Sequence, residues 1–182
     1  MKAMIRGTKG APLFLTVLAV ALISLSFLGD VSWSANYQRS SVPPTQIVPV
    51  DIKPGLCPNP LEVSKRGEVS VAILGTDRLD VRQIRRDSVR LEEILPVGSS
   101  IGDVARPYKL YTWQVSGEKV KEDSCTDKGP DGKLDLVLQF DKEDLLKVLG
   151  KVRDGDVRVL RISAWNKSGA RLVGQDVVVI VK

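Results

Sequence analysis

The chain has 182 residues, with 27 Lys and Arg, 22 Asp and Glu, and no histidine. Without an imidazole, a Ser-His-Asp triad, a Cys-His pair and a zinc site with histidine ligands are excluded. The formal net charge of +5 is modest. We therefore expect no nucleic acid among the partners, because nucleic-acid binding needs a clustered basic face.

The first 34 residues have the pattern of a secretion signal. Basic residues precede an apolar run of 16 residues from Leu13 to Leu28, and Ser32 and Ser34 are the small residues before a cleavage point at Ala35. The run is shorter than the roughly 20 residues that span a bilayer, which favours cleavage and export. A membrane is expected as a partner only if the segment stays uncleaved. Removing 34 of the 182 residues leaves 148, with a net charge of +3, enough for one domain.

Residues 35–46 are polar with a Pro pair, and we interpret them as a linker to a single domain, residues 47–182. Alternation of apolar and polar residues predicts half-buried strands, and the β-branched run 177–181 predicts a strand buried on both faces. The strands are predicted at 47–52, 67–74, 87–92, 108–115, 134–140, 156–165 and 177–181. A phase slip predicts a bulge at Leu160–Arg161, and residues 96–107, rich in Gly, Ser and Pro, are predicted as a loop.

One short helix is predicted at 142–149. Asp141 is a favourable N-cap, Leu145 and Leu149 share one face, and Gly150 is a common stop. Short strands, one helix and many Pro and Gly turns predict an all-β fold. We expect a mainly antiparallel β-sandwich, Ig-like in general architecture.

Cys57 and Cys125 are the two cysteines of the chain, and both lie in the exported part. In an oxidising compartment, two such thiols favour one disulfide. Closing a loop of about 69 residues stabilises a fold by roughly 4 kcal/mol in the chain-entropy model, less any strain. Two buried free thiols are the alternative. A catalytic thiol is disfavoured because no histidine is present to lower its pKa.

An acidic loop at 127–135 carries a pattern of site chemistry. Asp127, Asp131 and Asp135 fall at positions 1, 5 and 9 of a calcium loop, and Gly132 falls at the turn position 6. The carbonyl of Lys133, at position 7, is the natural backbone ligand. Calcium takes six to eight oxygens, so the loop predicts a calcium site.

Two positions depart from the full calcium loop. Gly129 at position 3 and Leu138 at position 12 have no side-chain oxygen, so the loop is not an EF-hand. Glu122, Asp123 and Asp141 are candidates to complete the ligand shell. An ordinary Pro-Asp-Gly turn is the alternative interpretation.

Four segments in order resemble a domain of secreted bacterial and archaeal proteins with an opening "IDIKPG" signature. They are Val50–Gly55, Pro58–Pro60, Val71–Thr76 and Asp131–Phe140. The resemblance spans residues 48–182. It implies an exported β-rich fold attached to surface proteins, a calcium loop and no established catalytic activity. It also supports pairing of the two cysteines, which flank signature segments.

Three surface hypotheses remain. Arg82, Arg85, Arg86 and Arg90 are interleaved with acids, which favours a solvated face over a polyanion site. Trp113 and Trp165 lie in strand-like stretches, which favours core packing over stacking on sugar rings. Adjacent carboxylates, such as Glu92 and Glu93, are poor evidence for a glycosidase pair, because neighbours on a strand face opposite ways.

We therefore expect a non-enzymatic exported β-sandwich, with no catalytic residues, secreted or held at a prokaryotic cell surface or periplasm. It is disulfide-stapled, calcium-stabilised, and serves cell-surface structure or interaction. The expected partner is a cell-surface protein or polysaccharide. The first alternative is a carbohydrate-binding module using exposed tryptophans, and a carboxylate hydrolase is the second, disfavoured because no general base is identifiable.

Overall fold

The computed structural model describes residues 44–108 and 120–182. The described residues belong to one compact unit, Val42–Lys182. The predicted signal, most of the predicted linker and Trp113 lie outside the described residues. So does the strand predicted at 108–115, except Tyr108, which is not in a strand.

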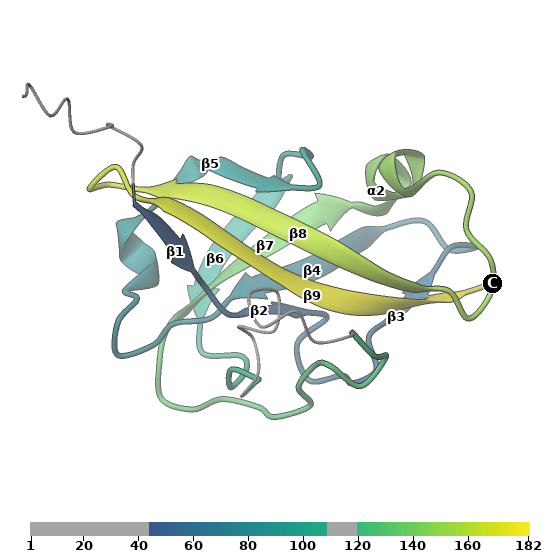
Figure 1. Cartoon of the computed structure of the whole chain (residues 1–182), viewed down its shortest axis with the longest axis horizontal. Coiled ribbons are helices and arrows are strands. Elements are labelled where there is room, and N and C mark those ends of the chain that lie inside the picture. Colours follow the sequence, from purple (N-terminus) through teal and green to yellow (C-terminus); the bar gives the residue numbers. More distant parts are fainter. Residues whose placement is uncertain (1–43, 109–119) are drawn as a thin grey trace, which may run out of the picture. The chain divides into compact units, whose positions relative to one another are not determined.

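The described residues form nine strands in two sheets, which confirms the all-β sandwich (Figure 1). The strands are β1 Thr45–Ile47, β2 Val50–Ile52, β3 Pro60–Glu62, β4 Glu68–Ile73, β5 Ile84–Leu91, β6 Gly98–Gly102, β7 Asp135–Asp141, β8 Val157–Asn166 and β9 Arg171–Val181. One sheet has the order β1-β9-β8-β5, with β3 also on β9, and the other has the order β2-β4-β7-β6. A 3-10 turn, η1 Val81–Gln83, precedes β5.

The long strand β9 organises the first sheet. It pairs antiparallel with β8, and its other edge takes β1 at Arg171–Val173 and β3 at Val179–Val181, both parallel. The middle of β9 therefore lies between two short strands on that edge. Strand β2, which belongs to the other sheet, contacts β9.

The chain changes sheets at Val48 and Pro49. The N–H of Val48 donates to the carbonyl of Val173 at 2.9 Å, and the carbonyl of Pro49 accepts from Leu74 at 3.0 Å. Proline has no N–H to donate, so it suits the point where one ladder ends and the next begins. The strand predicted across 47–52 is therefore two short strands, the first of which begins at Thr45.

Side chains of both sheets meet in an apolar core. On β7, Leu136, Leu138 and Phe140 are fully buried, as the alternation predicted, whereas Leu134 precedes the strand and is 46% exposed. The β-branched end of β9 is buried on both faces as predicted, except at Val181, which is 38% exposed. Val178 belongs to the core, and Val177 packs on the opposite face against Cys125.

The helix α2, Lys142–Leu149, confirms the predicted bounds and caps. The side chain of Asp141 accepts from the N–H of Asp144 at 3.0 Å, and Gly150 adopts a positive φ of 66° at the end. Leu145 is fully buried and joins the helix to the core.

Two predictions of secondary structure are wrong. Within the predicted loop 96–107, Gly98–Gly102 forms β6, because the strand β7 beside it supplies a complete ladder for residues of low strand propensity. The predicted bulge at Leu160–Arg161 is absent from the continuous β8–β9 register, and the irregularity lies in β5 between Arg85 and Arg90. The apparent phase slip arises because Val159 packs outward beside the disulfide.

Candidate functional site

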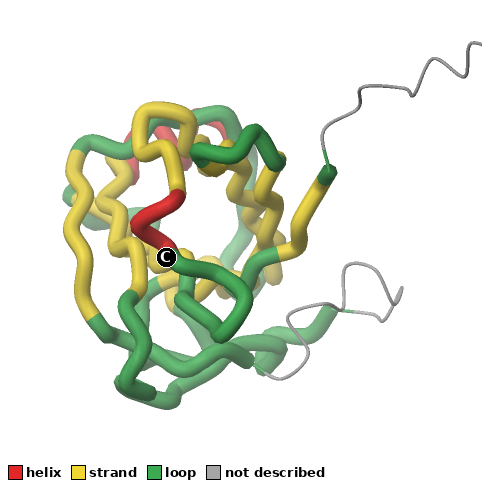
Figure 2. The backbone as a smooth tube through the Cα atoms, turned by 90° about the vertical axis from the view of Figure 1, so that its left-hand side faces the viewer, coloured by secondary structure: helices red, strands yellow, loops and turns green. Residues whose placement is uncertain are grey.

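A layer of irregular chain packs on the outside of the two sheets. We call residues 103–108 and 120–134 the cover. In Figure 1 much of the irregular chain gathers on the side where β2 lies, and Figure 2 shows loops gathered along one side of the strands. Val104 and Ala105 of the cover pack on Ala72 and Leu74, which face away from the core. The cover therefore packs on the outer face of the sheet β2-β4-β7-β6, which we call the small sheet.

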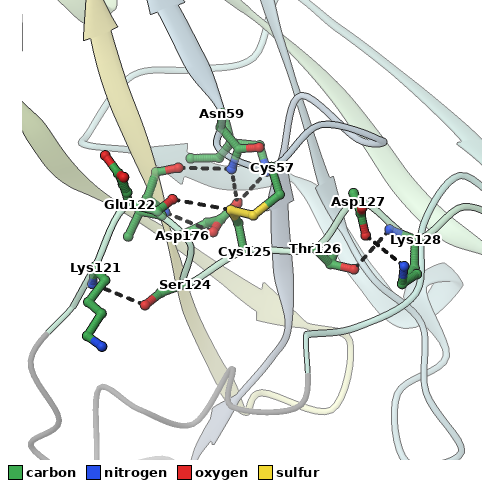
Figure 3. The surroundings of a disulfide bond; sticks show 12 residues. Cys57, Asn59, Lys121, Glu122, Ser124, Cys125, Thr126, Asp127, Lys128 and Asp176 are labelled. Atoms are coloured by element: carbon green, nitrogen blue, oxygen red, sulfur yellow. Dashed lines mark hydrogen bonds and ion pairs between the residues drawn. A yellow bond between two sulfur atoms is a disulfide. The ribbon is translucent and has the colours of Figure 1, made fainter. Parts of the chain in front are cut away.

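The disulfide between Cys57 and Cys125 attaches the cover to the segment between β2 and β3, and it confirms the predicted pairing. The two Cα atoms lie 5.6 Å apart across 68 residues of sequence. Cys125 is 5% exposed and packs with Val177, while Cys57 and Tyr108 complete the cluster. Figure 3 shows Asn59 and Asp176 next to the disulfide.

The residues predicted to bind calcium take different roles. Asp135 is fully buried, and its two oxygens accept from the N–H groups of Gly75 at 2.9 Å, Val104 at 2.8 Å and Ala105 at 3.3 Å. Burial raises the pKa of Asp135, while these hydrogen bonds act to lower it. Asp135 therefore ties the cover to the small sheet.

The other two carboxylates of the acidic loop lie nearer the solvent. Asp127 is exposed and pairs with Lys128 at 3.1 Å. Asp131 accepts from the N–H of Lys133 at 3.1 Å, and Gly132 has a φ of 90°. Asp103 of the cover accepts from the N–H groups of Asp131 and Gly132. These contacts are those of a braced turn.

Among residues 44–108 and 120–182, no group of three or more Asp, Glu, Cys or His side chains is placed to hold a metal ion. The donors of the acidic loop thus do not converge, because Asp135 is turned inward while Asp127 is turned outward. Of the residues proposed to complete the shell, Asp141 caps α2, and Glu122 and Asp123 are exposed. A calcium site in this loop stays a prediction.

A buried polar group that the sequence analysis did not single out lies at the edge of β9. Asp176 is 3% exposed, and its Oδ2 accepts from the N–H of Ile52 at 2.8 Å and from Nδ2 of Asn59 at 2.9 Å. Its Oδ1 accepts from the N–H of Val177. Nδ2 of Asn59 also donates to the carbonyl of Val177 at 2.9 Å. Side chains thus replace a backbone ladder between β2 and β9.

Asp51 of β2 is the second buried acid in this place. It is fully buried, and neither of its carboxylate oxygens has a hydrogen-bond partner within the described residues. Burial, then repulsion from Asp176 and Asp135, raises the pKa of Asp51 from 3.8 to about 8, with only a weak opposing contact from the N–H of Gly55. Burial also raises the pKa of Asp176, to about 7.

The sequence held one signal for this group. Asp51 lies between Val50 and Ile52, and Asp176 precedes five β-branched residues. A single acid inside a strand that is apolar on both sides is an exception to the rule that charged residues are exposed. The alternation in residues 47–52 assigned Val48, Val50 and Ile52 to one face of a strand. It did not predict the surroundings of Asp51 on the opposite face.

An exposed aromatic residue lies on the sheet formed by β1, β9, β8, β5 and β3. Trp165 of β8 is 37% exposed, so the prediction that it packs in the core is wrong. Its register partners are Arg85 on β5 and Arg171 on β9, both exposed. Directly opposed residues share a face of a sheet, so Trp165 lies between two arginine residues on one face.

Comparison of the chain with protein-family models, with curated proteins and with solved structures found no match. The resemblance to the "IDIKPG" domain therefore stays an expectation from the sequence. Within the described part of the chain, no helix has the length and apolar character to cross a membrane.

Proposed function

We propose that the protein is a non-enzymatic exported β-sandwich that serves cell-surface structure or interaction in a prokaryote. The observation that carries the proposal is the Cys57–Cys125 disulfide, which joins the cover to the sandwich. Disulfides form and persist in oxidising compartments and are rare in the cytosol. The signal-like residues 1–34 support the same location.

The disulfide serves structure in this proposal. It joins two segments of irregular chain that lack a shared strand ladder, and Cys125 is buried against Val177. The bond therefore holds the cover to the sandwich in an oxidising compartment. A structural role is supported because Cys125 is 5% exposed and packs against Val177.

The test is to express the full chain in a bacterium with an oxidising periplasm and to fractionate the cells. The expected product is extracytoplasmic, lacks residues 1–34 and has a mass about two daltons below that of the dithiol form, because a disulfide lacks both thiol hydrogens. The matched control is the Cys57→Ser/Cys125→Ser variant, which keeps the signal and loses any effect of reduction. A cytosolic product with an intact amino terminus and two labelled thiols contradicts the proposal.

A second candidate function is binding of an anionic surface polysaccharide at Trp165. An exposed indole stacks on the apolar face of a sugar ring, and Arg85 and Arg171 on either side supply charge for carboxylate or sulfate groups. Arg85 also pairs with Asp87 at 3.4 Å, a weak exposed pair that a ligand can replace. The position of the indole between two arginines favours an acidic over a neutral glycan.

Affinity electrophoresis in gels that contain neutral or acidic polysaccharides tests this candidate. We expect retardation by an acidic polymer, and Trp165→Ala weakens the binding about tenfold through loss of stacking. Leu95→Ala is the matched control, because Leu95 is a large apolar residue that is 54% exposed elsewhere. Equal retardation of both variants and the parent protein contradicts a role for Trp165.

A further inference from the structure

The orphaned oxygens of Asp51 and Asn59 are the strongest anomaly in the described part of the chain. Asp51 and Asn59 are both fully buried. Oδ1 and Oδ2 of Asp51 and Oδ1 of Asn59 have no hydrogen-bond partner among these residues. Buried polar atoms are almost always paired with protein or water, so three in one place require an explanation.

Asp176 connects the two residues that carry these oxygens. Oδ2 of Asp176 accepts from the N–H of Ile52, next to Asp51, and from the amide of Asn59. That second bond directs Nδ2 of Asn59 to Asp176 and leaves Oδ1 as the unpaired atom. Oδ1 of Asp176 accepts one N–H, from Val177, and a carboxylate oxygen has a second lone pair to offer.

The charge in this place is not balanced by side chains. Asp51, Asp135 and Asp176 are all buried, and the buried polar residues of the described ranges include no Lys or Arg. Asp51 is repelled by Asp176 and by Asp135. Lys53, two residues along the chain, directs its Nζ to the carbonyl of Pro60 at 2.9 Å. The ammonium of Lys53 is therefore bonded to a carbonyl.

A proton or a cation can relieve this imbalance, and the two differ in what they satisfy. A proton on Asp51 neutralises one carboxylate, yet it adds a donor that needs an acceptor and leaves Oδ1 of Asn59 unpaired. A cation can be coordinated by carboxylate and amide oxygens together. Two carboxylates with an amide oxygen are donors typical of a hard divalent cation, which also matches two negative charges.

We infer that Asp51, Asn59 and Asp176 form a divalent-cation site at the β2–β9 edge, with calcium as the best-matched ion. The proposed ligands are two carboxylates and one amide oxygen, so the site does not need a third acidic side chain. It uses no residue of the acidic loop. It goes beyond the proposed function. The cation fastens β2 and the β2–β3 segment to β9 beneath the disulfide.

The direct test measures bound metal and thermal stability of the full disulfide-bonded protein. After EDTA treatment, the protein is dialysed at about pH 8 against millimolar calcium, a concentration that occupies the calcium sites of extracellular modules. We expect one calcium ion per chain by inductively coupled plasma mass spectrometry, and a Tm several degrees above that in EDTA, because calcium binds only the folded state. No bound calcium and an unchanged Tm overturn the inference.

Variants locate the site. Asp51→Asn keeps the size of the side chain and removes the charge, so its Tm in EDTA at about pH 8 is expected to equal or exceed that of the parent protein. It is expected to lose the calcium-dependent rise in Tm. Asp127→Asn and Asp131→Asn are the matched controls, and both are expected to keep that rise. A rise that persists in Asp51→Asn and disappears in Asp127→Asn places calcium in the acidic loop and overturns the inference.

Discussion

The apolar core between the sheets and the buried acids beneath the cover are enclosed to the same degree but are built in different ways. Phe140, Leu138 and Asp51 are all fully buried. The core residues come from strands with a regular alternation, and packing does not require a specific partner for each atom. Each acid needs donors or ions at defined positions.

The acids obtain those donors from segments that are far apart in the sequence. Asp135 bonds N–H groups of Gly75, 60 residues away, and Val104, 31 residues away. Asp176 bonds Ile52, 124 residues away. The core therefore follows from local patterns, whereas the acidic region exists only after distant segments of the chain have come together. This difference leads us to expect that the two regions respond differently to mutation and reduction.

Truncation of the core has the largest expected effect. Phe140→Ala removes a fully buried ring from β7 and is expected to lower the free energy of unfolding by about 3–5 kcal/mol. Leu134→Ala is the matched control, since Leu134 precedes the same strand and is 46% exposed. We expect a change within about 0.5 kcal/mol for the control in urea titrations. Similar losses for both variants would contradict the assignment of the core.

Removal of the disulfide has the next largest effect, and it separates the two regions. The Cys57→Ser/Cys125→Ser variant is expected to lose up to roughly 4 kcal/mol of stability, because its unfolded chain gains freedom. Hydrogen exchange is expected to speed up first at the amides of Val104 and Ala105, which bond Asp135, and at that of Ile52, which bonds Asp176.

The amides of β4 at the centre of the small sheet serve as the internal control for this experiment, because β4 has strands on both edges. They are expected to keep their protection at denaturant concentrations at which the cover exchanges. Equal acceleration at β4 and in the cover would mean that the acidic region does not open on its own.

The same contrast explains which parts of the fold could be predicted from the sequence. The strands at 67–74 and 134–140, the helix at 142–149 and the disulfide partners were predicted, because alternation, capping and cysteine number are local or compositional signals. The strand β6 was missed, since Gly98–Gly102 has no pattern of its own and gains its ladder from β7.

The candidate sites were less predictable for the same physical reason. The spacing of Asp127, Asp131 and Asp135 indicates a loop but does not say which carboxylate turns inward, and Asp135 does so because Gly75, Val104 and Ala105 present their N–H groups there. Asp51 and Asp176 come together only when β2 and β9 cross from different sheets. No local pattern encodes such a crossing.

A comparison of two acids of the acidic loop tests this explanation, and the expected effect is smaller than in the experiments above. Asp135→Asn replaces an acceptor oxygen with a donor beside the N–H groups of the cover, and we expect a loss of about 1–3 kcal/mol in urea unfolding. Asp127→Asn, at an exposed surface pair with Lys128, is expected to change stability by less than about 0.5 kcal/mol. A larger loss for Asp127→Asn would contradict the inward role of Asp135.

The smallest expected effect lies outside both regions, at Trp165. The indole is 37% exposed between Arg85 and Arg171, and it contributes to neither the core nor the acidic group. Trp165→Ala is therefore expected to change the free energy of unfolding by less than about 1 kcal/mol, the size of an exposed cation–π contact. Urea denaturation followed by far-UV circular dichroism measures this without the indole signal. A loss as large as that for Phe140→Ala would mean that the indole supports the fold, and the exposed face would no longer be available as a binding surface.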